Sequence, residues 1–305
     1  YPNLRVMNQW TWHSRLNRAA DYVTRHPHLE LVELNSFGCG LDAVVTDQVQ
    51  EIMHQRGRLY TCLKIDQSLN LGAVRIRLRS LKAAIEERGE ETGSAKPIEY
   101  PKAVFTEAMK RDKDYTILAP EMSPIHFPII EAAVQREGYH LEIIPPIHED
   151  IDKGLSCVNN DACYPAIITI GSLMRALTSG KYDLSKTAVM LSQTGGMCRA
   201  SNYVGFLHKA LDEAGLSDIP VISLNTHGFE PQPGFHFSLS MGRRMIQAVI
   251  YGDALQQCLY RTRPYEKEPG SAETLCRRWQ KRCIEAILSG ESYTSYKKNI
   301  AGIIQ

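Results

Sequence analysis

Hydrophobic and polar positions along the chain follow two spacings, one typical of strands and one typical of helices. Short β-rich apolar runs alternate with longer stretches in which apolar residues recur every three or four positions. The predicted strands cover residues 29–34, 59–65, 115–119, 141–145, 187–191 and 219–224. The predicted helices cover residues 14–26, 46–56, 71–88, 123–137, 165–180, 199–214, 237–261, 272–288 and 293–304. This alternation predicts an α/β fold with parallel sheets and helices on both faces.

Several predicted boundaries carry local signals. Thr46 is a suitable N-cap for the helix that we expect over 46–56. Ser123 followed by Pro124 is typical of a cap and first turn, so we expect a helix to begin there. Gly215 fits the position after a helix C-terminus. Residues 147–164 are polar and are predicted as one long loop.

The composition changes once between two alternating blocks. Residues 87–101 are charged and contain Gly, Ser and Pro, which is typical of a linker. We therefore expect a first α/β lobe over 1–90, a linker over 91–101, a second α/β lobe over 102–235 and a helical C-terminal extension over 236–305. The chain begins with Tyr-Pro-Asn-Leu rather than Met, so we expect a piece of a longer protein with a partial first lobe.

Composition narrows the classes of function. The chain has 305 residues, of which 43% are hydrophobic, which predicts a folded protein. It has 35 Lys and Arg against 34 Asp and Glu, so the net charge of +1 argues against nucleic-acid binding. No apolar run reaches the roughly 18 residues that span a bilayer, and no signal peptide is visible, so we expect no membrane partner.

Eight cysteines are spread over the chain, and none forms a CxxC pair. The chain is too large and too regular for a disulfide scaffold, so a reduced cytoplasm is the better interpretation. The missing CxxC also lowers the expectation of a zinc ribbon or a thioredoxin-type redox pair. Buried thiols, a nucleophilic cysteine, or a metal site assembled from distant segments remain open.

Three cysteines share one setting. Cys39 and Cys198 each follow a predicted strand and precede a helix, and Cys163 ends the polar loop before the helix at Pro165. Ligands of doubly wound sheets gather beyond the carboxyl ends of the strands. Helix N-termini favour anions, and glycines allow N–H···S contacts. The flanking glycines, which we expect to help bind a cofactor, are Gly38, Gly40, Gly195 and Gly196.

The other cysteines fit packing better, since a free cysteine often behaves as a small buried hydrophobe. Cys62 lies within an apolar strand, and Cys258, Cys276 and Cys283 lie within helical patterns. Cys157 lies in the polar loop and stays undecided between the two interpretations.

Further candidates for chemistry are weaker. Arg75, Arg77 and Arg79 could hold phosphates, but a solvated helix face explains them as well. Neither GxxxxGK[ST] nor GxGxxG occurs, which argues against ATP hydrolysis by this chain and against a dinucleotide fingerprint. His126, near the end of a predicted strand, is a candidate proton donor or a capping residue.

Five segments resemble one family. The segments are NSFGCGLDAVVTDQ at 35–48, LKIDQSLNLGAVRIRLRSL at 63–81, NNDACYPAIITIG at 159–171, QTGGMCRASNYVGF at 193–206 and RPYE at 263–266. They resemble the 2-hydroxyacyl-CoA dehydratase superfamily, in particular its branch related to double-cubane-cluster proteins, which often carry a fused activase region. The resemblance extends from about residue 29 to residue 270 and centres on cysteine motifs.

The resemblance implies Rossmann-like lobes around an iron–sulfur cluster, either [4Fe–4S] or a double cubane, with Cys39, Cys163 and Cys198 as ligands. It implies an open iron for an acyl-CoA or small-molecule substrate, and low-potential electrons from an ATP-hydrolysing iron–sulfur activase dimer or a fused activase region. It also implies anaerobic cytoplasm, and a dimer or a larger chain. A double cubane needs about twice as many cysteines, so Cys157 is a weaker fourth candidate and other ligands would come from an absent portion or another subunit.

No catalytic residue is assigned. The polar neighbours that we expect to line the cavity are Asn159, Asn160, Asp161, Arg199, Ser201 and Asn202. Of these, Asn160 is a cofactor-binding candidate, and Arg199, Ser201 and Asn202 join His126 as catalytic candidates, although loop and helix capping explain such residues equally well. An ion pair between Arg263 and Glu266 is expected to tie the C-terminal helices to the lobe.

Two other classes stay open. The chain could be a non-catalytic cluster scaffold or an electron conduit within a larger assembly. It could also be a zinc or thiol protein with a Rossmann-like fold, in which case zinc would show four-coordinate N/S ligation.

Overall fold

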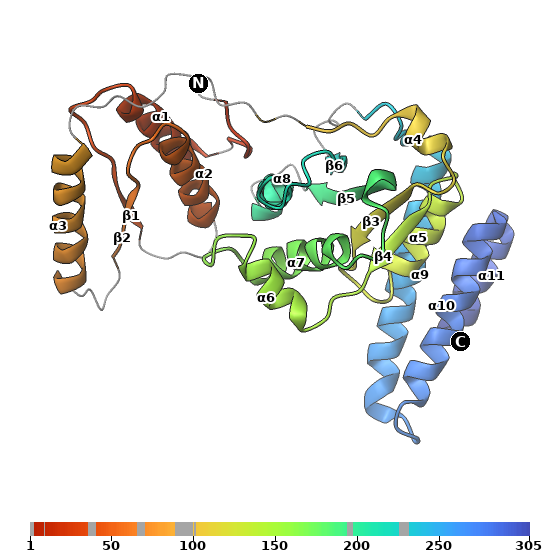
Figure 1. Ribbon diagram of the computed structural model, residues 1–305. Coiled ribbons are helices and arrows are strands. Elements are labelled where there is room, and N and C mark those ends of the chain that lie inside the picture. The colour runs from red at the N-terminus through yellow and green to blue at the C-terminus, as the bar shows by residue number, and fades with distance from the viewer. Residues whose placement is uncertain are drawn as a thin grey trace.

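The computed structural model describes residues 3–8, 10–35, 41–65, 71–88, 100, 102–193, 198–225 and 232–305 (Figure 1). The first elements in chain order are α1 (Thr11–Thr24), β1 (Val32–Asn35), α2 (Leu41–Gln55), β2 (Thr61–Lys64) and α3 (Leu71–Arg88). Strands β1 and β2 pair in parallel. Apolar residues of α1 and α2, among them Ala20, Val49 and Ile52, form a small core between these two helices.

A larger parallel sheet follows. Its elements are α4 (Glu107–Arg111), β3 (Thr116–Pro120), α5 (Phe127–Gln135), β4 (Leu141–Ile144), α6 (Glu149–Leu155), α7 (Tyr164–Thr178), η1 (Leu184–Lys186), β5 (Thr187–Gln193), η2 (Arg199–Asn202), α8 (Tyr203–Glu213) and β6 (Val221–Asn225). The strand order is β4-β3-β5-β6, and the pairs are parallel. The prediction of an α/β fold with parallel sheets is therefore confirmed.

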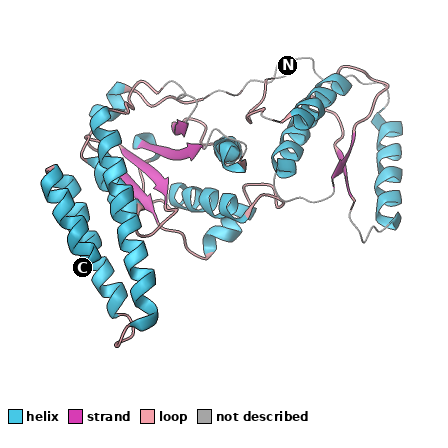
Figure 2. Ribbon diagram, turned by 180° about the vertical axis from the view of Figure 1, so that it is seen from behind, coloured by secondary structure: helices cyan, strands magenta, loops and turns pink. Residues whose placement is uncertain are grey.

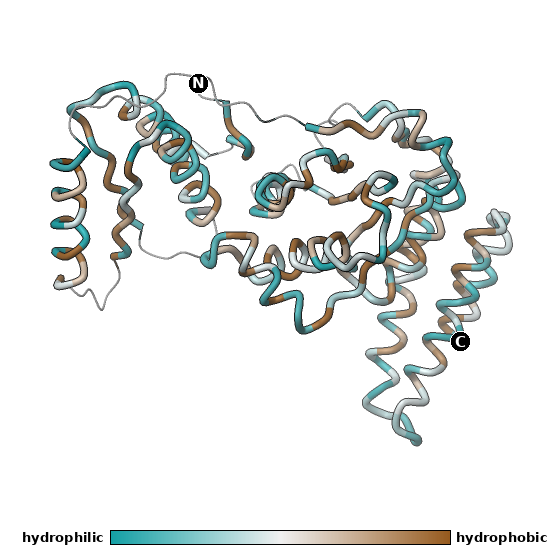
Figure 3. Tube along the Cα trace, in the orientation of Figure 1, coloured by the Kyte–Doolittle hydropathy of each residue, from teal (hydrophilic) through white to brown (hydrophobic). Residues whose placement is uncertain are grey.

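Both faces of this sheet are covered, because successive strand residues enter different cores. Leu118 of β3 packs in one core with Leu173 of α7 and Leu207 of α8. Its neighbour Ile117 packs in a second core with Val134 of α5 and Met241 of α9 (Leu239–Thr262). Hydrophobic positions accordingly run through the strands and α7 (Figure 3). This two-sided burial explains why the strands are apolar runs rather than alternating ones.

The strand order places a switch point between β3 and β5. The chain leaves β3 through α5 on one face toward β4, whereas it leaves β5 through α8 on the other face toward β6. The two connections diverge, and ligands of such sheets bind at the carboxyl ends of the strands where this happens. The described residues that follow the two strands, 121–126 and 198–202, therefore border the expected binding crevice.

Helices finish the chain: α9 (Leu239–Thr262), the short η3 (Arg263–Tyr265), α10 (Ser271–Ser289) and α11 (Tyr293–Ile304). They stand beside α5 as a layer on one side of the sheet (Figure 2). Tyr251, Leu255, Ile287 and Ile129 belong to one apolar cluster that holds this layer together. The predicted helical C-terminal segment is present, with bounds close to those expected.

Some predicted boundaries are wrong. The polar stretch 147–164 contains α6, whose first turn holds Glu149, Asp150 and Asp152, as the positive end of a helix dipole favours. Thr46 is not an N-cap, because α2 already begins at Leu41 and the Thr46 hydroxyl donates to Glu33 at 2.8 Å. The helix expected from Ser123 begins at Phe127 instead. The first turn predicted at Arg199 is the 3-10 helix η2 rather than α-helix.

The predicted linker over 91–101 falls almost wholly outside the described residues, so the domain boundaries stay a prediction. Within the described part of the chain, no helix combines the length and the apolar composition that crossing a membrane requires.

Candidate functional site

Two of the three predicted cysteine ligands occupy matching positions at the start of helical segments. Cys163 precedes α7 and Cys198 precedes η2, and both have extended backbones, with φ/ψ of −66°/146° and −73°/145°. Neither side chain makes a capping hydrogen bond. Cys163 is half-buried and Cys198 is exposed, so both thiols can be reached.

Tyr203, the first residue of α8, connects the two cysteines. Its hydroxyl lies 2.8 Å from the Cys163 sulfur. Burial, then the hydrogen bond and charge of Cys163, and then the charge of Cys198, raise the pKa of Tyr203 well above its usual value. The phenol therefore keeps its proton near neutral pH and can donate a hydrogen bond to a thiolate. Tyr203 thus contacts Cys163 directly and lies close enough to Cys198 for the charge of that thiol to act on the same phenol.

Cys39 lies outside the described residues, as do the candidate glycines Gly38, Gly40, Gly195 and Gly196. The helix that follows Cys39 in the sequence is α2, which contacts η2. Val44, in the first turn of α2, is 2% exposed and shares a core with Tyr203 and Val204. The helix after Cys39 and the helix after Cys198 thus pack against each other near their first turns.

A short N-terminal segment, Arg5–Met7, lies between α2 and α8 (Figure 1). The Arg5 guanidinium donates to Asp47 at 2.5 Å and to Glu51 at 2.9 Å on α2, and to the Gly205 carbonyl on α8. Although burial works against its charge, the two carboxylates raise the pKa of Arg5. We call Arg5–Met7 the strap, because it joins the two helices through one buried charge cluster.

The strap also fixes a residue of η2. The Met7 N–H donates to Asn202 Oδ1 at 2.7 Å. Asn202 is 1% exposed, and its Nδ2 has no hydrogen-bond partner among the described residues. A buried donor without an acceptor costs about 1–3 kcal/mol, so this amide is suited to an acceptor that the described residues do not supply.

The remaining candidates of this segment differ from one another. Ser201 is fully buried, which makes direct contact with a substrate difficult. Arg199 is half-buried, and its charge works against the raised pKa of Tyr203. Arg199 therefore lies near the same phenol and can offer positive charge to an anion.

The loop before Cys163 lines a polar cleft of about 390 Å³ between the two lobes. Cys157, Asn159, Asn160 and Asp161 lie along it, opposite Lys64 of β2. Asn159 accepts the Asp161 N–H at 2.9 Å, which is a loop cap. Asp161 pairs with Lys64 at 2.6 Å. The Cys157 sulfur lies 3.6 Å from the Ser156 hydroxyl, and the residue packs against the core, so local contacts account for much of this loop.

His126 follows β3 at the switch-point edge, but its ring is held against α9. Its Nδ1 lies 2.8 Å from the Ser123 hydroxyl and its Nε2 lies 3.1 Å from Asp253 Oδ1. A Cβ on Gly252 would come within 2.2 Å of the ring, so the ring can pack against α9 here only because residue 252 is glycine. No hydrogen bond or ion pair of the described structure joins His126 to either cysteine.

The cysteines that we expected to pack are buried to different degrees. Cys276 and Cys283 belong to the core of the C-terminal helices. Burial raises the pKa of Cys283 to about 12, so this thiol stays protonated and unreactive. Cys258 and Cys62 are half-buried, and burial again raises the pKa of Cys62.

Two predictions about arginines have clear outcomes. Arg75, Arg77 and Arg79 are exposed on α3, which fits a solvated face. The expected ion pair of Arg263 and Glu266 is wrong, because the Glu266 carboxylate instead accepts the backbone N–H groups of Gly270 and Ala272 at 2.8 and 3.0 Å. Glu266 therefore caps the start of α10.

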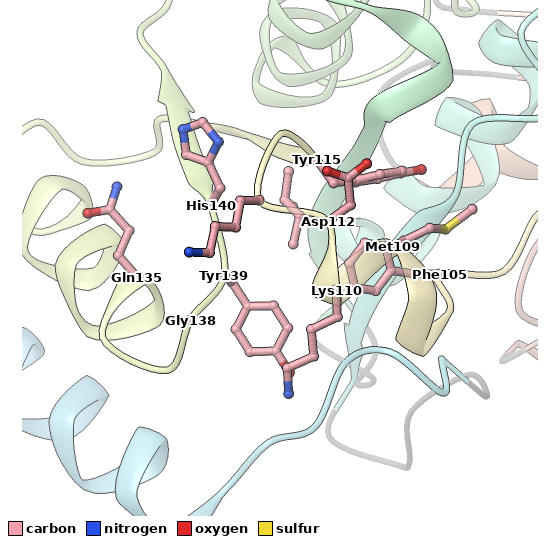
Figure 4. A pocket seen from close by; sticks show the side chains of 11 residues that line it. Phe105, Met109, Lys110, Asp112, Tyr115, Gln135, Gly138, Tyr139 and His140 are labelled. Atoms are coloured by element: carbon pink, nitrogen blue, oxygen red, sulfur yellow. The ribbon is translucent and has the colours of Figure 1, made fainter.

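A cavity of about 400 Å³ opens at the opposite edge of the sheet, where Tyr115 precedes β3 and His140 precedes β4 (Figure 4). Lys110 lies over the Tyr139 ring at 4.7 Å from its centroid. None of the predicted site residues lines this cavity. The candidate site is thus the carboxyl edge near Cys163 and Cys198.

Sequence reasoning missed Tyr203 and the strap. Tyr203 stands five residues after Cys198, a spacing that returns a side chain to the cysteine region only once η2 and α8 are known. Arg5 carries no local signal, because its partners are 42 to 200 residues away in the sequence. No model of a known protein family, no curated protein and no solved structure matches this chain.

The residues present fit a sulfur-rich anion. Thiolates are the usual ligands of iron–sulfur clusters, and hydrogen bonds to sulfur tune them. The site supplies the thiols of Cys163 and Cys198, the neutral phenol of Tyr203 and the Asn202 Nδ2, which has no partner among the described residues. Among the described residues, no three His, Cys, Asp or Glu side chains gather as a metal site, and the third predicted ligand, Cys39, lies outside them.

Proposed function

We propose that this chain is an iron–sulfur protein of the 2-hydroxyacyl-CoA dehydratase type, with Cys39, Cys163 and Cys198 as cluster ligands. The observation that supports it most is the Tyr203 hydroxyl, which lies 2.8 Å from the Cys163 sulfur and whose pKa the charge of Cys198 also raises. The packing of α2 against η2 adds support, because α2 directly follows the Cys39 segment. A cluster of this kind supplies one-electron chemistry at low potential at an iron without a protein ligand.

The side chains of the site would hold and protect this group. Cys163 and Cys198 bind it, and Tyr203 orients the Cys163 sulfur through its hydroxyl. The Arg199 charge and the α7 N-terminus favour an anion at this edge. Because Cys163 is half-buried, the site would admit little water next to this residue. Because Cys198 is exposed, a substrate could reach the site from that direction.

The wider assignment follows the resemblance of the motifs. We propose an ATP-dependent activase, separate or fused, as the electron donor, an acyl-CoA or small molecule as the substrate, and anaerobic cytoplasm as the compartment. A dimer or a larger chain would provide any further ligands of a double cubane. A non-catalytic cluster scaffold is the second candidate, because the acid–base group that the described residues bring to the Cys163 thiol is Tyr203, and its raised pKa keeps it protonated.

The ligand assignment is tested by iron content after anaerobic reconstitution. We expect Cys198→Ala to lose most of the iron while the protein stays folded, because Cys198 is exposed and contributes little to packing. Cys62→Ala is the matched control and should keep its iron, since Cys62 lies in β2 away from the site. Equal iron content in the two variants would contradict the assignment.

A further inference from the structure

The amide of Asn202 is held in one orientation by the strap. Its Oδ1 accepts the Met7 N–H at 2.7 Å. The NH₂ group is therefore fixed at the other end of the planar amide. The strap cannot shift easily, because Arg5 is buried and bonded to Asp47, Glu51 and the Gly205 carbonyl. The Arg5 backbone N–H also donates to Gln48 at 2.9 Å.

The NH₂ group of Asn202 has no acceptor among the described residues, although the residue is 1% exposed. Water cannot readily reach it, and a buried donor without a partner is rare in folded proteins. Asn202 ends η2, which Cys198 opens, and Tyr203 follows it directly and contacts Cys163. The free donor thus belongs to the residue four positions after Cys198 and directly before the tyrosine that contacts Cys163.

We propose that Asn202 Nδ2 donates a hydrogen bond to a sulfur anion of the bound cluster, either an inorganic sulfide or a ligating thiolate, and so raises the reduction potential of the cluster. This inference rests on the proposed function. The physical reason is charge: a reduced cluster carries one more negative charge, so a fixed N–H group stabilises the reduced state more than the oxidised one. Asn202 is then a tuning residue, not a ligand.

The proposed donor role of Asn202 explains why its buried amide is hydrogen-bonded to the strap. An amide free to turn could present its oxygen to the sulfur and would lower the potential instead. The Met7 N–H prevents this, because turning the amide would break its bond to Oδ1. The charge cluster of Arg5 therefore acts at a distance, through Met7, on the orientation of one donor.

The test is the midpoint reduction potential of the reconstituted protein. It is measured by anaerobic redox titration, monitored by visible absorbance or by electron paramagnetic resonance. Asn202→Leu removes the donor, and Asn202→Asp removes it while keeping an oxygen for Met7. We expect both midpoints to fall below that of the unchanged protein, and the Asp variant to fall further because it adds a negative charge. Iron content should stay unchanged in both variants.

Asn299→Leu is the matched control, because it also removes a buried amide. Asn299 is 5% exposed, and its partners are Arg282, Tyr251 and Glu291, in the C-terminal helices. It should lower thermal stability and leave the midpoint unchanged.

The outcomes separate this inference from the proposed function. An unchanged protein that binds no iron would refute both. If the unchanged protein binds iron, and both Asn202 variants keep its midpoint, the tuning role is wrong while the function stands. Loss of iron from both variants would also overturn the inference, since the amide would then be needed for assembly rather than for potential.

Discussion

A single phenol shows how this site treats charge at the scale of one residue. The Tyr203 hydroxyl contacts the Cys163 sulfur, and the charge of Cys198 helps to raise the pKa of Tyr203. Because the phenol keeps its proton, it acts as a hydrogen-bond donor toward a thiolate. The phenol therefore complements a sulfur ligand, because it keeps its proton and can donate it in a hydrogen bond to Cys163. That complementarity is what a sulfur-ligated anion requires.

Glu131 provides a test of residue electrostatics away from the site. Burial, and then the charge of Glu142, raise the pKa of Glu131 to about 7. Since the folded state holds this proton more tightly than the unfolded chain, the contribution to stability is present below the unfolded pKa and is lost as pH rises toward 7. Glu131→Gln should therefore unfold at higher urea concentration than the unchanged protein at pH 8.

The comparison has an internal control at low pH. Near pH 4.5 both proteins carry an uncharged group at this position, and Gln can still accept the bond from Gln135 that reaches Glu131 at 2.9 Å. Their urea midpoints should then approach each other. A constant difference from pH 4.5 to pH 8 would show that the carboxyl does not titrate as described.

At the scale of elements, the position of Cys163 depends on how closely α6 crosses α7. A Cβ on Gly171 would come within 1.9 Å of the Asp150 carbonyl, and one on Gly154 within 2.1 Å of the Ile167 carbonyl. Backbone atoms cannot move aside as a flexible side chain does. The two glycines thus let α6 lie against α7 and hold the loop 156–163 that leads to Cys163.

Gly171→Ala should therefore destabilise the protein by about 3 kcal/mol, at the upper end of overpacking effects. Gly242→Ala is the matched control, because a Cβ there would meet only the side chain of Phe237, at 3.1 Å. Denaturant unfolding measures both. Equal losses in the two variants would mean that the α6–α7 crossing is not tight.

The sequence predicts elements better than their ends. The parallel α/β pattern follows from apolar periodicity, which both faces of the sheet enforce through burial. Thr46 was predicted as an N-cap because Thr favours that position. It lies within α2 instead, and its hydroxyl donates a buried hydrogen bond to Glu33 of β1. The helix α6 was missed because its apolar positions are few and its stability comes from packing on α7.

The candidate site divides in the same way. Cysteines and glycines could be chosen from the sequence because their chemistry is local. Tyr203 and the strap could not, because their roles depend on contacts between segments far apart in the chain. Asn202 was proposed as a polar neighbour, but only the bond to Met7 shows which end of its amide is free.

At the scale of the whole molecule, the strap joins α2, which follows β1, to α8, which follows β5. Lys209 of α8 also pairs with Asp47. The buried Asp47 carboxylate therefore forms ion pairs both with Arg5 of the strap and with the second lobe. Lys64 and Asp161 form a second link, but this one is exposed. The relative position of α2 and η2 should depend on the buried link far more than on the exposed one.

Arg5→Ala leaves Asp47 and Glu51 with less compensation, and breaking a buried charge pair costs about 3–5 kcal/mol. We expect lower stability and reduced iron binding, although no cysteine changes. Lys64→Ala is the control, since an exposed pair contributes about 0–1 kcal/mol. Iron content and thermal unfolding of both variants check this, and iron binding that survives Arg5→Ala in full would argue against a role of the strap in the site.

The central claim is that this chain holds an iron–sulfur cluster. It is tested most directly by iron, acid-labile sulfide and zinc content, together with a visible spectrum, on anaerobically purified and reconstituted protein. The account predicts brown protein with nearly equal iron and sulfide, and the iron count per chain would separate one cubane from two. Colourless protein without iron after reconstitution, or stoichiometric zinc, would contradict it.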